Sequence, residues 1–140
     1  MKKLTKQQLS RIAKKYKINT FYIFGSQATG KAGKLSDYDF AVLLDDKILA
    51  EKYGDYKIKI ISELLRLIKT DHIDLVILND EKTPLLLKYN VIKTGKILFE
   101  KNKNKRVNLE VNILRRWLDW QYFEKMWGDI YVKCVAEGKF

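Results

Sequence analysis

Apolar residues follow two different spacings along the chain, and these predict a mixture of helices and strands. Spacings of three and four residues place side chains on one face of a helix, whereas short continuous apolar runs are typical of buried strands. The helical spacing predicts helices over residues 5–17, 47–53, 55–69, 84–94 and 106–136. The apolar runs predict strands over residues 21–24, 38–44, 73–78 and 96–100, the last at an edge of the sheet.

Capping and breaking residues mark several of these boundaries. Residues 5–8 read Thr-Lys-Gln-Gln, a capping box in which the Thr hydroxyl and the Gln side chain each satisfy a backbone donor. Thr83 and Pro84 are expected to be the cap and the first residue of one helix, and Gly95 its end. Gly54 is expected to interrupt the helical pattern.

The order of the elements predicts one small α/β domain with flanking helices and a long C-terminal helix. The 140 residues are enough for a single compact core. We assign residues 1–100 to this core and 101–140 to a helical extension, which includes a charged connector over 101–105. Aromatic residues recur in the extension at spacings of three and four, and we expect this face to pack on the sheet, with docking of a partner as the alternative. They are Trp117, Trp120, Phe123, Trp127 and Tyr131.

Composition excludes several classes of protein. With 46% hydrophobic residues, the chain is too apolar to be disordered. It has no apolar run near the roughly 20 residues that a membrane-spanning helix requires. The start lacks the apolar stretch of a signal peptide, and the single cysteine, Cys134, cannot form an intramolecular disulfide. We therefore expect a cytoplasmic protein.

The chain is strongly basic, with a formal net charge of +11. Nine basic residues and no acid precede Asp37, and a second basic run covers residues 96–106. Most of the cations are lysines, and there is no cluster of arginines and aromatics of the kind that binds single strands. A small polyanion such as ATP or an acidic protein accounts for the charge, and direct binding of nucleic acid is not expected.

Three carboxylates stand at the beginnings of predicted strands. Asp37 and Asp39 are two residues apart, so both side chains should leave the same face of the sheet. Asp74 begins the next strand and can complete a triad if the two strands are neighbours. Because close carboxylates repel unless a cation lies between them, the pattern favours a divalent metal site, and oxygen ligands suit Mg²⁺.

A glycine turn follows the strand over 21–24. Gly25 would allow a ligand to approach the backbone, and the Ser26 hydroxyl with the following amides could bind phosphate oxygens. The stretch over 26–36 is otherwise predicted to be a loop with one helical turn after Gly25. A phosphate site and an acidic cluster on separate strand ends are the elements of two-metal phosphoryl or nucleotidyl transfer.

These residues resemble the nucleotidyltransferase signature of the DNA polymerase β superfamily. Residues 24–30 read Phe-Gly-Ser-Gln-Ala-Thr-Gly, and residues 36–40 read Ser-Asp-Tyr-Asp-Phe. The short chain is similar to the minimal nucleotidyltransferases (MNT), the antitoxins of HEPN/MNT toxin–antitoxin pairs. The resemblance covers about residues 5–100 and implies the small mixed-sheet nucleotidyltransferase fold. One departure is Thr29, which stands where family members often have arginine, so a cationic phosphate contact is lost or supplied by Lys31 or Lys34.

The resemblance also assigns roles to individual residues. It implies that ATP, as substrate, binds through residues of the glycine turn and its continuation, Gly25, Ser26, Gly30 and Lys31. It implies that three acids are both the catalytic residues and the Mg²⁺ ligands, Asp37, Asp39 and Asp74.

In that family the partner is a HEPN ribonuclease toxin, which receives AMP on a tyrosine hydroxyl and is thereby neutralised. We therefore expect a protein adenylyltransferase that can form a hetero-oligomer with its toxin. One alternative is a binding antitoxin that only occludes the toxin. Another is a nucleotidyltransferase that acts on a small molecule or an RNA end.

Overall fold

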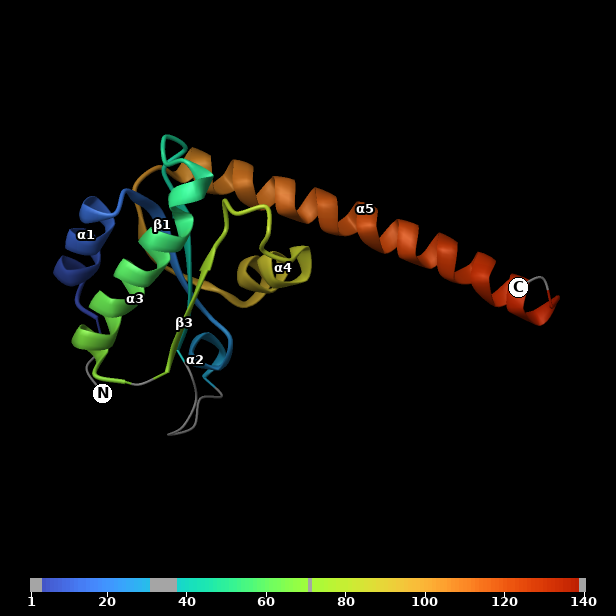
Figure 1. The fold of residues 1–140 in the computed structure, drawn as a ribbon, viewed down its shortest axis with the longest axis horizontal. Coiled ribbons are helices and arrows are strands. Elements are labelled where there is room, and N and C mark those ends of the chain that lie inside the picture. Colours follow the sequence, from blue (N-terminus) through green and yellow to red (C-terminus); the bar gives the residue numbers. More distant parts are fainter. Residues whose placement is uncertain (1–3, 31–37, 71, 139–140) are drawn as a thin grey trace.

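The computed structural model describes residues 4–30, 38–70 and 72–138, and these form a four-stranded sheet with helices on both faces (Figure 1). The strands are β1 (Ile18–Phe24), β2 (Tyr38–Leu44), β3 (Ile73–Ile77) and β4 (Lys96–Glu100). The helices are α1 (Lys6–Lys15), α2 (Ser26–Thr29), a 3-10 turn η1 (Ala50–Lys52), α3 (Tyr53–Ile68), α4 (Leu85–Thr94) and α5 (Lys103–Ala136). Within the described residues, no helix is long and apolar enough to cross a membrane.

The sheet is mixed, with the strand order β3-β2-β1-β4. β1 pairs antiparallel with both β2 and β4, whereas β2 pairs parallel with β3. The parallel pair needs a long connection, which α3 provides. The α/β fold with a mixed sheet, flanking helices and an edge strand over 96–100 is therefore confirmed.

Alternation along the strands divides the core between the two faces of the sheet. One face carries α1 and α3, and its apolar cluster includes Phe40, Val42 and Leu64. The other face carries α4 and the beginning of α5, and its cluster includes Ala41, Val76 and Val91. The second face is smaller, and it is the face on which the functional residues described below lie.

Several predicted boundaries were confirmed, among them the capping box. The Gln8 amide donates to the Thr5 hydroxyl, and the Thr5 amide donates to the Gln8 side chain. Gly95 caps the end of α4. Thr83 does not cap α4, because its hydroxyl donates instead to the Ile77 carbonyl, and Pro84 occupies the cap.

The predicted starts of two helices, α3 and α5, were wrong. Gly54 does not interrupt the helical pattern but lies in the first turn of α3. Glycine costs a helix only about 1 kcal/mol relative to alanine, and the buried residues Ile60, Leu64 and Ile68 on the same helix outweigh that cost. The long helix begins at Lys103 rather than at residue 106, because the Asn102 side chain accepts from the amides of Asn104 and Lys105.

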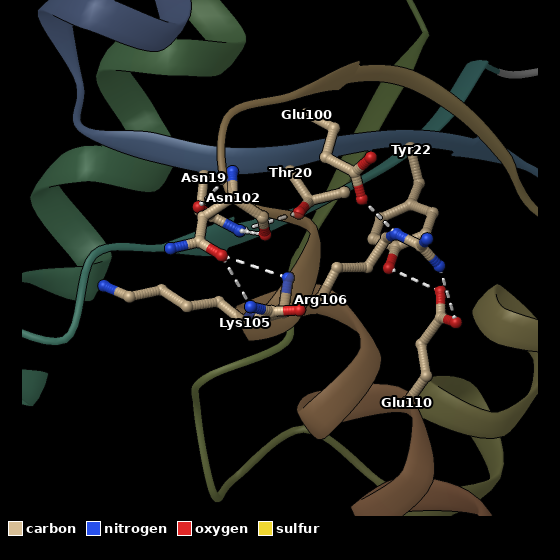
Figure 2. A network of polar contacts seen from close by, with 9 residues as sticks. Asn19, Thr20, Tyr22, Glu100, Asn102, Lys105, Arg106 and Glu110 are labelled. Atoms are coloured by element: carbon tan, nitrogen blue, oxygen red, sulfur yellow. Dashed lines mark hydrogen bonds and ion pairs between the residues drawn. The ribbon is translucent and has the colours of Figure 1, made fainter.

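β1 begins three residues earlier than predicted, at Ile18. The polar residues Asn19 and Thr20 hid this part of the strand, although both are buried. The Asn19 amide group donates to the Thr20 hydroxyl and to the Asn102 carbonyl, and it accepts from the Asn102 amide (Figure 2). These contacts satisfy the buried amide and connect β1 to the cap of α5.

α5 extends far beyond the rest of the molecule (Figure 1). Ile113 is its buried residue, and Leu109 packs on the smaller apolar cluster. Trp117 stacks on Tyr89 of α4, with ring centroids 4.4 Å apart. The expectation that the whole aromatic face packs on the sheet was therefore wrong, because the sheet and α4 end before the helix does. Its later aromatic residues are exposed, namely Trp120, Phe123, Trp127 and Tyr131.

A charged network joins the beginning of α5 to the sheet (Figure 2). Arg106 bonds to Glu100 of β4 and, at 2.9 Å, to Glu110. The hydroxyl of Tyr22, a buried residue of β1, donates to Glu110 at 2.8 Å. Burial and this hydrogen bond to a carboxylate both raise the pKa of the Tyr22 phenol. The network therefore fixes the direction in which α5 leaves the sheet.

We predict that Arg106→Met destabilises the fold more than Tyr22→Phe. Without Arg106, two partly buried carboxylates lose their cation, with an expected cost of about 2 to 3 kcal/mol. Tyr22→Phe removes one hydrogen bond and leaves Glu110 paired with Arg106, with an expected cost of about 1 kcal/mol. Urea unfolding of both variants measures the difference, and equal costs would contradict this account of the network.

A second prediction concerns Glu63, a buried residue of α3 that joins α3 to α1. Burial alone would raise the pKa of Glu63, but hydrogen bonds from Lys15 and Tyr16 outweigh it and hold the pKa below its ordinary value of 4.5. Stability from this group is therefore complete above pH 4.5 and is lost as the pH falls through the lowered pKa. Glu63→Gln should flatten the acid limb of a plot of unfolding free energy against pH, and an unchanged limb would refute the assignment.

Candidate functional site

The turn after β1 places the backbone against a carboxylate of β2. Gly25 has φ +71, in the left-handed region that favours glycine. A Cβ atom built on Gly25 would lie 2.6 Å from Oδ2 of Asp39, which is closer than van der Waals contact allows. α2 begins at the next residue, and the Ala28 amide donates to the Gly25 carbonyl. Only glycine allows this turn and this carboxylate to share the space.

The sheet register brings two of the three predicted acids together. Asp39 pairs with Phe24 of β1 on one side and with Asp74 of β3 on the other. Ala41 and Val76 stand two residues after Asp39 and Asp74 on the same strands, and both belong to the apolar cluster beside α4. Asp39 and Asp74 therefore lie on that same face. Asp39 is half-buried and Asp74 is exposed, so the pair forms the rim between the core and solvent.

The structure groups some of the predicted site residues and leaves others undescribed. Gly25, Asp39 and Asp74 lie together at one end of the sheet, from three adjacent strands. Gly30 directly follows α2 and has φ +76. The backbone of Ser26 begins α2 next to Gly25. Three further predicted residues lie outside the described parts of the chain, namely Asp37, Lys31 and Lys34.

Asp74 also lines a cavity of about 340 Å³ along the free edge of β3. Lys57 of α3 and Lys82 of the β3–α4 connection line the same cavity. Sequence analysis did not select these lysines, because neither stands in a motif and they are far apart along the chain. Asp80 lines the cavity as well, so the described lining carries two lysines and two acids, and the lysines suit a ligand with several negative charges.

The chemistry of this donor set fits a hard divalent cation. Asp39 and Asp74 supply carboxylate oxygens, the ligands that Mg²⁺ prefers. Among the described residues, no three His, Cys, Asp or Glu side chains form a group that could hold a metal. Two carboxylates are enough when substrate phosphates and water supply the remaining ligands, as is usual for Mg²⁺.

Comparison with known proteins identifies the family. A family model described as "Polymerase beta, Nucleotidyltransferase" matches residues 7–104, from the second residue of α1 to the start of α5. Because this match spans more than half of the chain, the chain belongs to that nucleotidyltransferase family. The match contains Gly25, Asp39 and Asp74.

One curated relative is the Protein adenylyltransferase MntA of Aphanizomenon flos-aquae, 38% identical over 88 residues. The aligned region covers 56% of this chain and 54% of the relative, so the chain spans about half the length of the curated protein that it matches.

Two solved structures have the same fold. A chain of the crystal structure of a toxin–antitoxin with AMP-PNP superposes with a TM-score of 0.70 at 21% identity, covering 92% of this chain and 99% of that chain. A chain of the tri-AMPylated Shewanella oneidensis HEPN toxin in complex with MNT antitoxin gives a TM-score of 0.63 at 19% identity, covering 91% and 95%. Because the coverage extends over nearly the whole chain, these likenesses confirm the nucleotidyltransferase fold, including the long C-terminal helix.

We predict that Gly25→Ala disrupts the site more than the fold. The new Cβ must displace the Asp39 carboxylate, and a non-glycine residue in the left-handed region costs roughly 1 to 3 kcal/mol. Gly138→Ala is the matched control, because Gly138, after the end of α5 and away from the site, has the same sign of φ but open space where its Cβ would stand. Unfolding of both variants gives the common cost of backbone strain. Binding of Mg²⁺ and AMP-PNP should fall at least tenfold further in Gly25→Ala, and equal loss in both variants would contradict the role of the Asp39 contact.

Proposed function

We propose that this protein is a protein adenylyltransferase that transfers AMP from ATP to a hydroxyl of a HEPN toxin and thereby acts as its antitoxin. The observation that carries the proposal is the arrangement of Gly25, Asp39 and Asp74. The glycine turn lies against one carboxylate, and the second carboxylate lies beside the first on the neighbouring strand. Membership of the nucleotidyltransferase family and the 38% identity to an adenylyltransferase support it. The proposed reaction takes place in the cytoplasm, where ATP is supplied.

The chain's own groups position the triphosphate of ATP. We assign the β- and γ-phosphates to the turn at Gly25 and to the backbone amides that follow it, because glycine leaves the backbone open to a close approach by a ligand. Lys57 and Lys82 line the cavity that Asp74 also lines, and we assign to them a contribution of positive charge toward the phosphates. Asp39 and Asp74, together with Asp37, would hold Mg²⁺, which when bound offsets negative charge on the entering and leaving oxygens.

The transfer itself is an in-line displacement at phosphorus. The acceptor oxygen forms a bond to the α-phosphorus while the bond between the α-phosphorus and the bridging oxygen of the β-phosphate breaks, and pyrophosphate leaves. The acceptor hydroxyl loses its proton to a base, and we assign this role to Asp74. Its exposure at the edge of the sheet leaves it accessible to a hydroxyl from another molecule.

We propose a tyrosine hydroxyl of the toxin as the acceptor. One of the structures with this fold contains a tri-AMPylated HEPN toxin, which supports a protein acceptor. Added AMP brings bulk and negative charge to the toxin surface, and near a ribonuclease site these would hinder the binding of RNA.

ATP labelled on either the α- or the γ-phosphate tests the proposal directly. The protein is incubated with Mg²⁺ and a HEPN toxin, taken from the gene next to its own where that gene encodes one, and label on the toxin is measured. We expect α-label and no γ-label on the toxin, and loss of at least a hundredfold in rate for Asp39→Asn and Asp74→Asn. Tyrosine as the acceptor is checked by mass spectrometry of the labelled peptide.

Asp55→Asn is a matched control, because Asp55 is an exposed acid in the first turn of α3 and is not among the residues that line the cavity with Asp74. It should keep the rate of the wild type. If the toxin is silenced without α-label, and the two active-site variants silence it equally well, the protein is a binding antitoxin and the proposed reaction is wrong.

A further inference from the structure

The C-terminal part of α5 exposes most of its large apolar side chains. The stack of Trp117 on Tyr89 is the last aromatic contact between α5 and α4. We call residues 118–136 the arm. Figure 1 shows the arm extending from the sheet and α4 into open space. A solvent-exposed helix that carries this many large apolar side chains is unusual in a monomer, because apolar patches of this kind mark interaction sites.

One face of the arm continues the face that is buried in the core. Ile113 is 2% exposed, and Trp120, seven residues later, is 54% exposed. Phe123, Trp127 and Ile130 follow at spacings of three, four and three, and their exposures lie between 44% and 52%. With Cys134 these residues form a continuous stripe of two heptads. Such a stripe is typical of a helix that pairs with another helix.

The area of the stripe is sufficient for a stable pair. A large aromatic side chain carries roughly 150 to 250 Å², and about half of each is exposed here. With Tyr131 and Met126 at its borders, the stripe offers about 600 Å² on each copy. Two copies would bury about 1,200 Å², the lower end of the range for specific interfaces.

The stripe is complementary to itself when two arms run antiparallel. In that orientation the two central positions of one heptad face those of the other. Trp120 lies opposite the partner's Ile130, and Phe123 opposite the partner's Trp127. In this register Asp119 lies beside the partner's Lys133, and symmetry creates this ion pair twice. Glu124 lies beside its own copy, and Arg116 lies level with the partner's Cys134, next to Lys133; these are the unfavourable charged contacts of the arrangement.

The length of the arm fits the same register. Ile113 is the last buried residue of α5, and the helix ends at Ala136. With Trp120 opposite the partner's Ile130, the end of each helix reaches the level of residue 114 of the other. Each arm therefore spans the whole of the partner's arm, and its last turn lies level with Trp117 of the other copy, the residue that stacks on α4.

From the stripe, its area, its charges and its length, we propose that two copies of this protein associate through an antiparallel pair of α5 arms. The proposal does not depend on the adenylyltransferase activity. It assigns Trp120, Phe123 and Trp127 to a contact between copies.

Light scattering on the purified protein, without toxin, tests the proposal over a range of concentrations. We expect a dimer that becomes monomeric in the variant Trp120→Gln/Phe123→Gln/Trp127→Gln. The matched control changes three exposed apolar residues on the other side of the arm, Leu118→Gln/Tyr122→Gln/Val132→Gln, and should stay dimeric. A monomer at all concentrations, or a dimer that both variants leave intact, would overturn the proposal, and the first result would indicate that another protein covers the arm.

Charge reversal tests the register, and it keeps the test valid if the glutamine variant unfolds the arm. Asp119→Lys should weaken the dimer at least tenfold, because two lysines then face each other at both ends of the pair. The double variant Asp119→Lys/Lys133→Asp should restore the affinity, and Glu124→Gln should increase it. Failure of the double variant to restore the dimer would refute the antiparallel register.

Discussion

The parallel register between β2 and β3 is the constraint on which the site depends. It sets Asp39 beside Asp74, while the antiparallel register with β1 sets Asp39 beside Phe24 and the turn at Gly25. A slip of one residue would move Asp39 from the α4 face to the face that carries α1 and α3. The apolar residues that alternate with the acids, Phe40 and Leu75, oppose such a slip because they are buried in the larger core. Packing on one face therefore fixes the chemistry on the other.

The two faces of the sheet divide stability from function. The larger cluster, with the Lys15–Tyr16–Glu63 contact beside it, joins α1 and α3 to the sheet. The smaller cluster lies on the face that carries the carboxylate pair, and the cavity follows the edge of β3 between α3 and the β3–α4 connection. The Arg106 network then directs α5 along this second face and out past α4 (Figures 1 and 2).

Sequence patterns predicted β2 without error, because its apolar run and the acids before it are both strong signals. They also predicted the Gly25 turn from the glycine that ends an apolar run, and they placed Asp74 near Asp39 on condition that the two strands are neighbours, which the parallel pairing of β2 and β3 fulfils. The shared face of Asp37 and Asp39 stays a prediction. They missed the start of β1, because the burial of Asn19 depends on Asn102, which is distant in sequence. They misassigned the arm, because helical periodicity shows that a face will be covered but not which surface covers it. They missed Lys57 and Lys82 because neither lysine stands in a motif, and only the folded chain brings the two to the same cavity.

Binding of Mg²⁺ and AMP-PNP, followed residue by residue by NMR on the isotopically labelled protein, tests the central claim most directly. Our account predicts that the largest amide shifts occur at Gly25, Ala28, Asp39 and Asp74, and that they disappear in Asp39→Asn. A second, basic cavity of about 510 Å³ lies at the opposite end of β1 and is lined by lysines that include Lys14, Lys17 and Lys101. Shifts confined to that cavity, and unaffected by Asp39→Asn, would contradict the assignment of the nucleotide site.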